Sequence, residues 1–295
     1  MRKRILAALS AAILATFAFV AINQIPAQAD PPLENCFTQL TTCGYPTTAT
    51  TGPRNGHTLT PYTPGGGDFH STSTNQVIED LDITGCLVVD DPGVIVRDVR
   101  FQGDCFAYIE TVGSGTVTIE YTEIICNGGG TGVAFSDVTI TNSHIRRCEN
   151  GVSAGSNVTI TDSINEAYEA TPEEHGDLIQ GWEGENVLID GNLLSGYNPM
   201  TSAIIIDADG TTDWTITNNF LSSGAYTLYC PTSNVDGFVV TGNRFYPAGE
   251  DATTRETDRR SPAFGMTTDC DTAGITWSGN ITDLGDTLND DGTVS

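Results

Sequence analysis

The sequence predicts an all-β protein, a single-stranded right-handed parallel β-helix (solenoid) with disulfides. Two observations predict it: a short apolar phrase of the type Val-Thr-Ile recurs along the chain, and most copies are followed by a similar turn. One strand cannot bury its own apolar face, but copies stacked roughly 4.8 Å apart make a continuous core. A β-sandwich also has many short strands, but sandwich strands do not repeat one phrase together with its turn. We therefore favour the β-helix.

The recurring phrase alternates apolar and outward residues, which is the two-residue period of a strand with one buried face. Successive copies are 20 to 37 residues apart, and loop insertions explain the longer intervals. The copies are Val94–Val96, Val117–Ile119, Val138–Ile140, Val158–Ile160, Val187–Ile189, Trp214–Ile216, Phe238–Val240 and Ile275–Trp277.

A turn pair follows most copies, and a second strand follows most turns. Asn and Gly tolerate the left-handed backbone that such turns need, and stacked Asn side chains can hydrogen-bond from coil to coil. The turn pairs are Asn142-Ser143, Asp162-Ser163, Gly191-Asn192, Asn218-Asn219, Gly242-Asn243 and Gly279-Asn280. The second strands are Leu87–Val89, Ala107–Ile109, Val133–Phe135, Val152–Ala154, Leu178–Gln180, Ile204–Ile206 and Leu228–Cys230.

The chain begins with a segment typical of a secretory signal peptide, residues 1–29. A basic stretch precedes a mostly apolar one, and Ala27-Gln28-Ala29 has the small-x-small form of a cleavage site. Beyond it, no stretch approaches the roughly 18 apolar residues of a membrane span. We expect an N-terminal Thr-, Pro- and Gly-rich cap over residues 30–75, the β-helix over 76–282 and an acidic flexible tail over 283–295.

The charge excludes two classes of partner. The chain has 12 basic and 38 acidic residues, and removing residues 1–29 takes away three bases and no acid, so the charge goes from −26 to −29. Such a surface repels nucleic acid and anionic membranes. We expect neither as a partner and expect a secreted monomer.

All eight cysteines lie beyond the predicted cleavage site, which favours disulfides in an exported chain. No CxxC or Cys/His cluster indicates zinc. Near-neighbour pairing is the hypothesis, although sequence alone leaves other connectivities open. The expected pairs are Cys36–Cys43, Cys86–Cys105, Cys126–Cys148 and Cys230–Cys270.

Three segments carry a resemblance to a known group of proteins. Residues 43–61 (CGYPTTATTGPRNGHTLTP), 77–85 (VIEDLDITG) and 174–180 (EHGDLIQ) resemble signatures of exported right-handed β-helix proteins common in actinobacteria. The wider class is similar to pectate lyases and polygalacturonases, so the resemblance implies work on carbohydrate without naming a reaction. Neither the polygalacturonase Asn-Thr-Asp, Asp-Asp and Gly-His-Gly set nor a pectate-lyase-like basic motif is present, so neither mechanism carries over.

The coil from Val158 to Gly184 is the predicted site, because its loop is longer and more polar than those before it. His175 and Asp177 are two residues apart, so on extended backbone they can point the same way and act as an acid/base pair. Asp207, one coil later, is expected roughly 5–10 Å from the Asp177 strand, a range that spans both carboxylate separations of glycosidases. The same carboxylates could instead hold Ca²⁺, or be ordinary solvated acids.

Four further residues are candidates for binding substrate. Trp182 could stack on a sugar ring or simply pack, and Arg147 could bind a carboxylate or pair with Glu149. Gln180 aligns with Phe135, Ala154 and Ile206, and that inward register favours a buried structural amide over sugar binding. Tyr168, in the long loop, is an alternative base to His175.

The leading hypothesis is a secreted enzyme that degrades a polysaccharide bound along the helix. A lyase would use His175 or Tyr168 as the base, with Arg147 or Ca²⁺ neutralising a uronate. A hydrolase would use Asp177 and Asp207 as acid and base. The scarcity of cations weighs against an anionic substrate unless Ca²⁺ takes part. The alternative is a non-catalytic carbohydrate-binding or cell-surface protein on the same fold.

Overall fold

A computed structural model describes residues 35–65, 68–166, 175–196, 200–206, 211–233, 235–248 and 260–295. All of them belong to one compact unit that extends from Leu33 to Ser295. The segment expected to be a signal peptide lies outside the described residues. Within the described part of the chain, no helix is long and apolar enough to cross a membrane.

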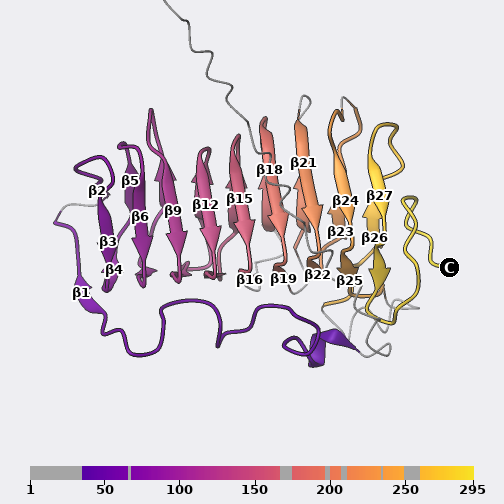
Figure 1. The fold of residues 1–295 in the computed structure, drawn as a ribbon, viewed down its shortest axis with the longest axis horizontal. Coiled ribbons are helices and arrows are strands. Elements are labelled where there is room, and N and C mark those ends of the chain that lie inside the picture. Colours follow the sequence, from indigo (N-terminus) through magenta and orange to yellow (C-terminus); the bar gives the residue numbers. More distant parts are fainter. Residues whose placement is uncertain are drawn as a thin grey trace, which may run out of the picture. The chain divides into compact units, whose positions relative to one another are not determined.

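The chain winds through three parallel sheets in turn, sheet A, sheet B and sheet C, and each strand pairs with the strand three places along (Figure 1). Sheet A consists of β1 (Thr60–Tyr62), β4 (Leu81–Thr84), β7 (Arg100–Gln102), β10 (Glu123–Ile125), β13 (His144–Arg146), β16 (Ile164–Glu166), β19 (Leu193–Ser195), β22 (Phe220–Ser222), β25 (Arg244–Phe245) and β28 (Ile281–Thr282). This is the predicted right-handed parallel β-helix.

Sheet B carries the second strand of each coil. Its members are β2 (Phe69–His70), β5 (Leu87–Val89), β8 (Ala107–Thr111), β11 (Thr131–Phe135), β14 (Asn150–Ala154), β17 (Asp177–Gly181), β20 (Ser202–Ile206), β23 (Tyr226–Tyr229) and β26 (Gly265–Thr268). Sheet C holds β3 (Val77–Glu79), β6 (Val94–Arg97), β9 (Val117–Glu120), β12 (Val138–Thr141), β15 (Val158–Thr161), β18 (Glu185–Asp190), β21 (Thr212–Thr217), β24 (Val239–Thr241) and β27 (Thr276–Ser278).

Sheet C contains every copy of the recurring phrase, and its register is the one that the sequence predicts. Val138 pairs with Val117 on one side and with Val158 on the other, and the series continues through Val187 to Trp214. These side chains are at most 3% exposed and form one hydrophobic core with residues from sheets A and B. The apolar phrases thus bury each other from coil to coil.

The predicted Asn ladder runs through the turns between sheets C and A. Asn192, Asn219, Asn243 and Asn280 are fully buried, and each side-chain Nδ2 donates to a strand carbonyl. The Oδ1 of each of the last three accepts from both the backbone N–H and the Nδ2 of the Asn one coil earlier. Ser163 and Ser143 continue the ladder towards the N-terminus.

Residues 35–59, here called the N-terminal strap, run alongside the coils rather than only over the first one (Figure 1). The strap includes a short 3-10 helix, η1 (Cys36–Thr38), whose Cys36 N–H donates to Asp283 on the last coil over 2.9 Å. Gly52 N–H donates to Asn142 O in the middle, and His57 Nδ1 lies 2.6 Å from Asp80 near the first coil. The strap therefore links both ends of the solenoid. The strands β1 and β2 then occupy the first coil, within the predicted cap.

Four disulfides are formed, and their pairs are those expected from the sequence: Cys36–Cys43, Cys86–Cys105, Cys126–Cys148 and Cys230–Cys270. No free cysteine remains among the described residues. Three of the bonds, all except Cys36–Cys43, join residues beside strand ends one coil apart, where stacking brings the sulfurs together. Four disulfides are typical of a protein that folds in an oxidising compartment.

Candidate functional site

The outer face of sheet B carries an open pocket of about 500 Å³ over strands β8 to β17. Besides the hydroxyl residues Thr131 and Ser153, its lining includes three kinds of side chain. The aromatic ones are Phe106, Phe135 and Trp182, the acidic ones are Asp104 and Glu149, and the amides are Asn150 and Gln180. We call this the sheet B pocket.

The three aromatic rings are exposed, which is unusual for side chains of this size. Phe106 is 80% exposed, Trp182 54% and Phe135 41%. Each stands at or just beyond one end of a sheet B strand, so the core does not cover it. Exposed rings grouped around a pocket are typical of a binding surface, because each offers a flat apolar face to a ligand.

Gln180 lines this pocket, and the structure corrects its predicted register by one residue. Gln180 pairs with Ser153 and Ile205, whereas Gly181 pairs with Ala154 and Ile206. The correction arises because Ile179, rather than Leu178, is the register partner of Val152 and Ile204, which leaves Gly181 as the inward residue after Gln180. The amide is therefore half-buried at the pocket, not inside the core.

The pocket is acidic. Asp104 is exposed and Glu149 is half-buried, and no basic residue is among the described residues that line it. Nearby arginines are engaged with acids one coil away on sheet A: Arg100 pairs with Asp82, and Arg146 with Glu123 over 2.9 Å. The two carboxylates of the lining repel an anionic ligand, and no cation lines the described pocket beside them.

The two predicted catalytic residues beside the pocket lie in different environments. Asp177, 3% exposed at the start of β17, accepts a hydrogen bond from the Ser202 hydroxyl, and its backbone N–H donates to Glu149 O. His175 is exposed, with its Nδ1 3.5 Å from the Thr201 hydroxyl. Burial raises the pKa of the Tyr229 hydroxyl and the charge of Asp177 raises it further, which places Asp177 near this residue of β23.

The remaining predicted residues are more scattered. Arg147 occupies the turn between β13 and β14 with a left-handed backbone, φ 65°. Its charge acts on Tyr108, where burial raises the pKa of the hydroxyl and Arg147 opposes the shift. Tyr168 and Asp207 lie outside the described residues, so the expected approach of Asp207 to the Asp177 strand stays a prediction.

Among the described residues, one group has ligand atoms close enough to share a metal ion: His57, Asp80 and Asp98, within 4.8 Å of one another. It joins the strap to the first coils, far in sequence from the residues predicted for Ca²⁺. Arg54 also forms an ion pair with Asp98, and burial raises the pKa of that carboxyl while the Arg54 hydrogen bonds lower it more. Arg54 already offsets the charge of one of the two carboxylates in this cluster.

Sequence reasoning missed Asp104, Phe106, Phe135 and Glu149, although Gln180 and Trp182 were among its candidates. A signal was present, because Asp104 and Phe106 flank a cysteine and Phe135 ends a predicted strand. By itself this signal does not separate a surface site from a core position, because aromatic residues on other successive coils, such as Trp214 and Phe238, are fully buried.

The fold and the pocket define the class: a disulfide-containing right-handed parallel β-helix protein with an aromatic and acidic pocket on one sheet. No protein-family model matches the chain. No curated protein matches it significantly either.

Proposed function

We propose that the protein is an exported glycoside hydrolase that binds a neutral polysaccharide in the sheet B pocket. The observation that carries the proposal is the lining itself, with three exposed rings, two amides and two carboxylates. Rings can stack on sugar faces, and amides and carboxylates can bind hydroxyl groups. The open form of the pocket suits a chain that extends beyond it in both directions.

The charge of the pocket favours hydrolysis over elimination. A lyase abstracts a proton next to a uronate, whose carboxylate needs a cation to neutralise it. The described lining offers Asp104 and Glu149 and no cation. A neutral sugar avoids this repulsion, and two carboxylates are what most glycosidases use. We therefore choose the hydrolase among the two reactions that the sequence left open.

In the proposed reaction, one carboxylic acid protonates the glycosidic oxygen, and the other carboxylate takes a proton from the water that attacks the anomeric carbon. Asp104 and Glu149 precede β8 and β14, which are separated by two strand spacings, roughly 10 Å. A strand spacing of this size is nearer to the wide carboxyl separation of inverting enzymes than to the roughly 5–5.5 Å of retaining ones, so we propose inversion of the anomeric centre. Asp177, whose N–H binds Glu149 O, supports the strand next to Glu149.

Export and kinship are part of the same proposal. The N-terminal segment has the form of a signal peptide, and four disulfides fit an oxidising destination. Two observations support a place in the wider class similar to pectate lyases and polygalacturonases. One is the parallel β-helix itself. The other is the resemblance to exported actinobacterial β-helix proteins, which residues 43–61, 77–85 and 174–180 carry.

The test is a panel of neutral and anionic polysaccharides, with reducing ends and absorbance near 235 nm measured together. We expect reducing ends from a neutral polymer without absorbance, and proton NMR should show the inverted anomer first. Glu149→Gln should reduce turnover by at least about a hundredfold with little change in binding, whereas Trp182→Ala should weaken binding. Leu284→Ala, at an exposed position outside the pocket, is the control. Absorbing products would refute the hydrolase, and binding without turnover would instead support the non-catalytic alternative.

A further inference from the structure

A second pocket, of about 330 Å³, opens at the last strand of sheet B. We call it the terminal pocket. Two aromatic residues, Tyr226 and Phe264, line it together with four carboxylates, and their rings lie 5.9 Å apart between centroids. Phe264 is 71% exposed. The carboxylates are those of Asp269, Asp271, Asp290 and Asp291.

The terminal pocket lies on the same face of the solenoid as the sheet B pocket. Gln180, Ile205, Tyr229 and Thr268 are register partners on the successive strands β17, β20, β23 and β26. Gln180 lines the first pocket and Thr268 the second. Three strand spacings, roughly 14 Å, therefore separate them, and a ligand that covers both from β8 to β26 spans roughly 29 Å.

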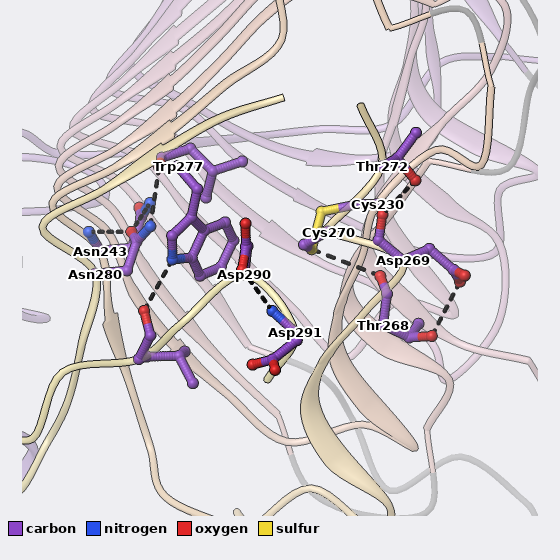
Figure 2. The surroundings of a disulfide bond; sticks show 12 residues. Cys230, Asn243, Thr268, Asp269, Cys270, Thr272, Trp277, Asn280, Asp290 and Asp291 are labelled. Atoms are coloured by element: carbon purple, nitrogen blue, oxygen red, sulfur yellow. Dashed lines mark hydrogen bonds between the residues drawn. A yellow bond between two sulfur atoms is a disulfide. The ribbon is translucent and has the colours of Figure 1, made fainter. Parts of the chain in front are cut away.

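Hydrogen bonds orient the carboxylates of the terminal pocket. The Asp291 Oδ1 accepts from the Thr293 N–H over 2.9 Å, and the Asp269 Oδ2 accepts from the Thr268 hydroxyl over 2.9 Å. Each of these bonds involves one of the two oxygens of its carboxylate. The Cys230–Cys270 disulfide anchors the loop beside Asp269 (Figure 2).

A buried hydroxyl in the same pocket is unused. Thr267 is 6% exposed, and its Oγ1 has no hydrogen-bond partner among the described residues. The hydroxyl faces Gly292 on the pocket wall, where an added Cβ would lie 3.0 Å from it. A buried polar atom without a partner is costly, and this one borders the terminal pocket, although the oxygen itself is buried behind the pocket wall.

The arrangement suits sugar hydroxyls better than a cation. In Figure 2 the carboxylates of Asp269, Asp290 and Asp291 turn in different directions rather than towards one point. Consistently, no three acids of this pocket have ligand atoms within 4.8 Å of one another in the described part of the chain. A Ca²⁺ ion needs six to eight oxygens converging at about 2.3–2.6 Å. Separated acceptors beside two aromatic rings instead match the spread hydroxyls and apolar face of a sugar.

From this we infer that the terminal pocket is a second glycan subsite, so that one neutral polysaccharide chain lies along sheet B and occupies both pockets. The inference rests on the proposed function of the sheet B pocket. Two linked subsites bind a chain that reaches both more tightly than either binds alone, because the second contact is intramolecular. Chain length should therefore control affinity.

The experiment is calorimetry with the full mature protein and cello- and manno-oligosaccharides from disaccharide to octasaccharide. We expect affinity to rise with length and then rise again once the ligand reaches the terminal pocket. Phe264→Ala and, separately, Asp271→Asn should weaken octasaccharide binding at least about tenfold and leave the shortest bound ligand unchanged. Leu284→Ala is the matched control, since Leu284 is 58% exposed and lines neither pocket.

The outcomes separate this inference from the proposed function. If Trp182→Ala abolishes binding while Phe264→Ala and Asp271→Asn bind the octasaccharide like the wild type, the second subsite is refuted and the first stands. If no oligosaccharide binds, the proposed function fails and the inference falls with it. A CaCl2 titration is run in parallel. Binding of Ca²⁺ that Asp271→Asn removes would show a cation site and overturn the inference.

Discussion

The Asn ladder gives a stability prediction that can be worked from its contacts. Asn219→Ala removes four hydrogen bonds, which join its side chain to Asn192, Ile189 and Asn243. Every one of them is buried, so water cannot replace the lost partner. At about 1 kcal/mol net for each bond, the free energy of unfolding should fall by about 3–5 kcal/mol. Urea unfolding followed by tryptophan fluorescence measures it.

Two variants test the physical reason. Asn219→Ser keeps one acceptor, as Ser163 and Ser143 do at the same ladder position, so it should lose only about 2 kcal/mol. Asn127→Ala changes an exposed amide and should stay within about 0.5 kcal/mol of the wild type. The expected difference in the free energy of unfolding between Asn219→Ala and Asn127→Ala is roughly 3–5 kcal/mol. A difference below about 1 kcal/mol would show that the ladder does not stabilise the turns.

Two further perturbations follow from the turns and the strap. Burial, and after it the charge of Asp190, raises the pKa of the Asp162 carboxyl. Above this raised pKa the ionised carboxylate lowers the stability of the fold. The lost stability returns as the pH falls through the raised pKa towards the ordinary value of about 3.9. Asp162→Asn keeps a residue that tolerates the backbone φ of 48° at this position. It should raise the melting temperature at pH 7 and not at pH 3. An equal gain at both pH values would show that the charge of Asp162 is not what destabilises the fold. Asp283→Ala removes the acceptor of the Cys36 and Phe37 N–H groups, so these two amides should exchange hydrogen for deuterium faster than in Asp283→Asn, and equal exchange would show that Asp283 does not hold the strap.

The sequence by itself determined the coil and most of its core. The recurring phrase, the Asn and Ser turns and the near-neighbour cysteines all describe contacts between one coil and the next. Val138 pairs with Val158, and Asn192 hydrogen-bonds to Asn219, because each coil places the same residue of its repeat above that of the coil before. Such contacts are repeated along the chain, so their pattern is visible without coordinates.

Only the tertiary structure decided what breaks the repeat. Gln180 faces the pocket because Ile179, rather than Leu178, pairs with Val152 and Ile204, an offset of one residue that matching the apolar triplets does not predict. The strap joins Cys36 to Asp283, 247 residues away, and nothing periodic marks that contact. Asp104, Phe106 and Glu149 gather because three coils stack with their strand ends aligned. A repeated sequence specifies which residues are neighbours one coil apart, whereas a site is formed by the side chains that differ from the repeat.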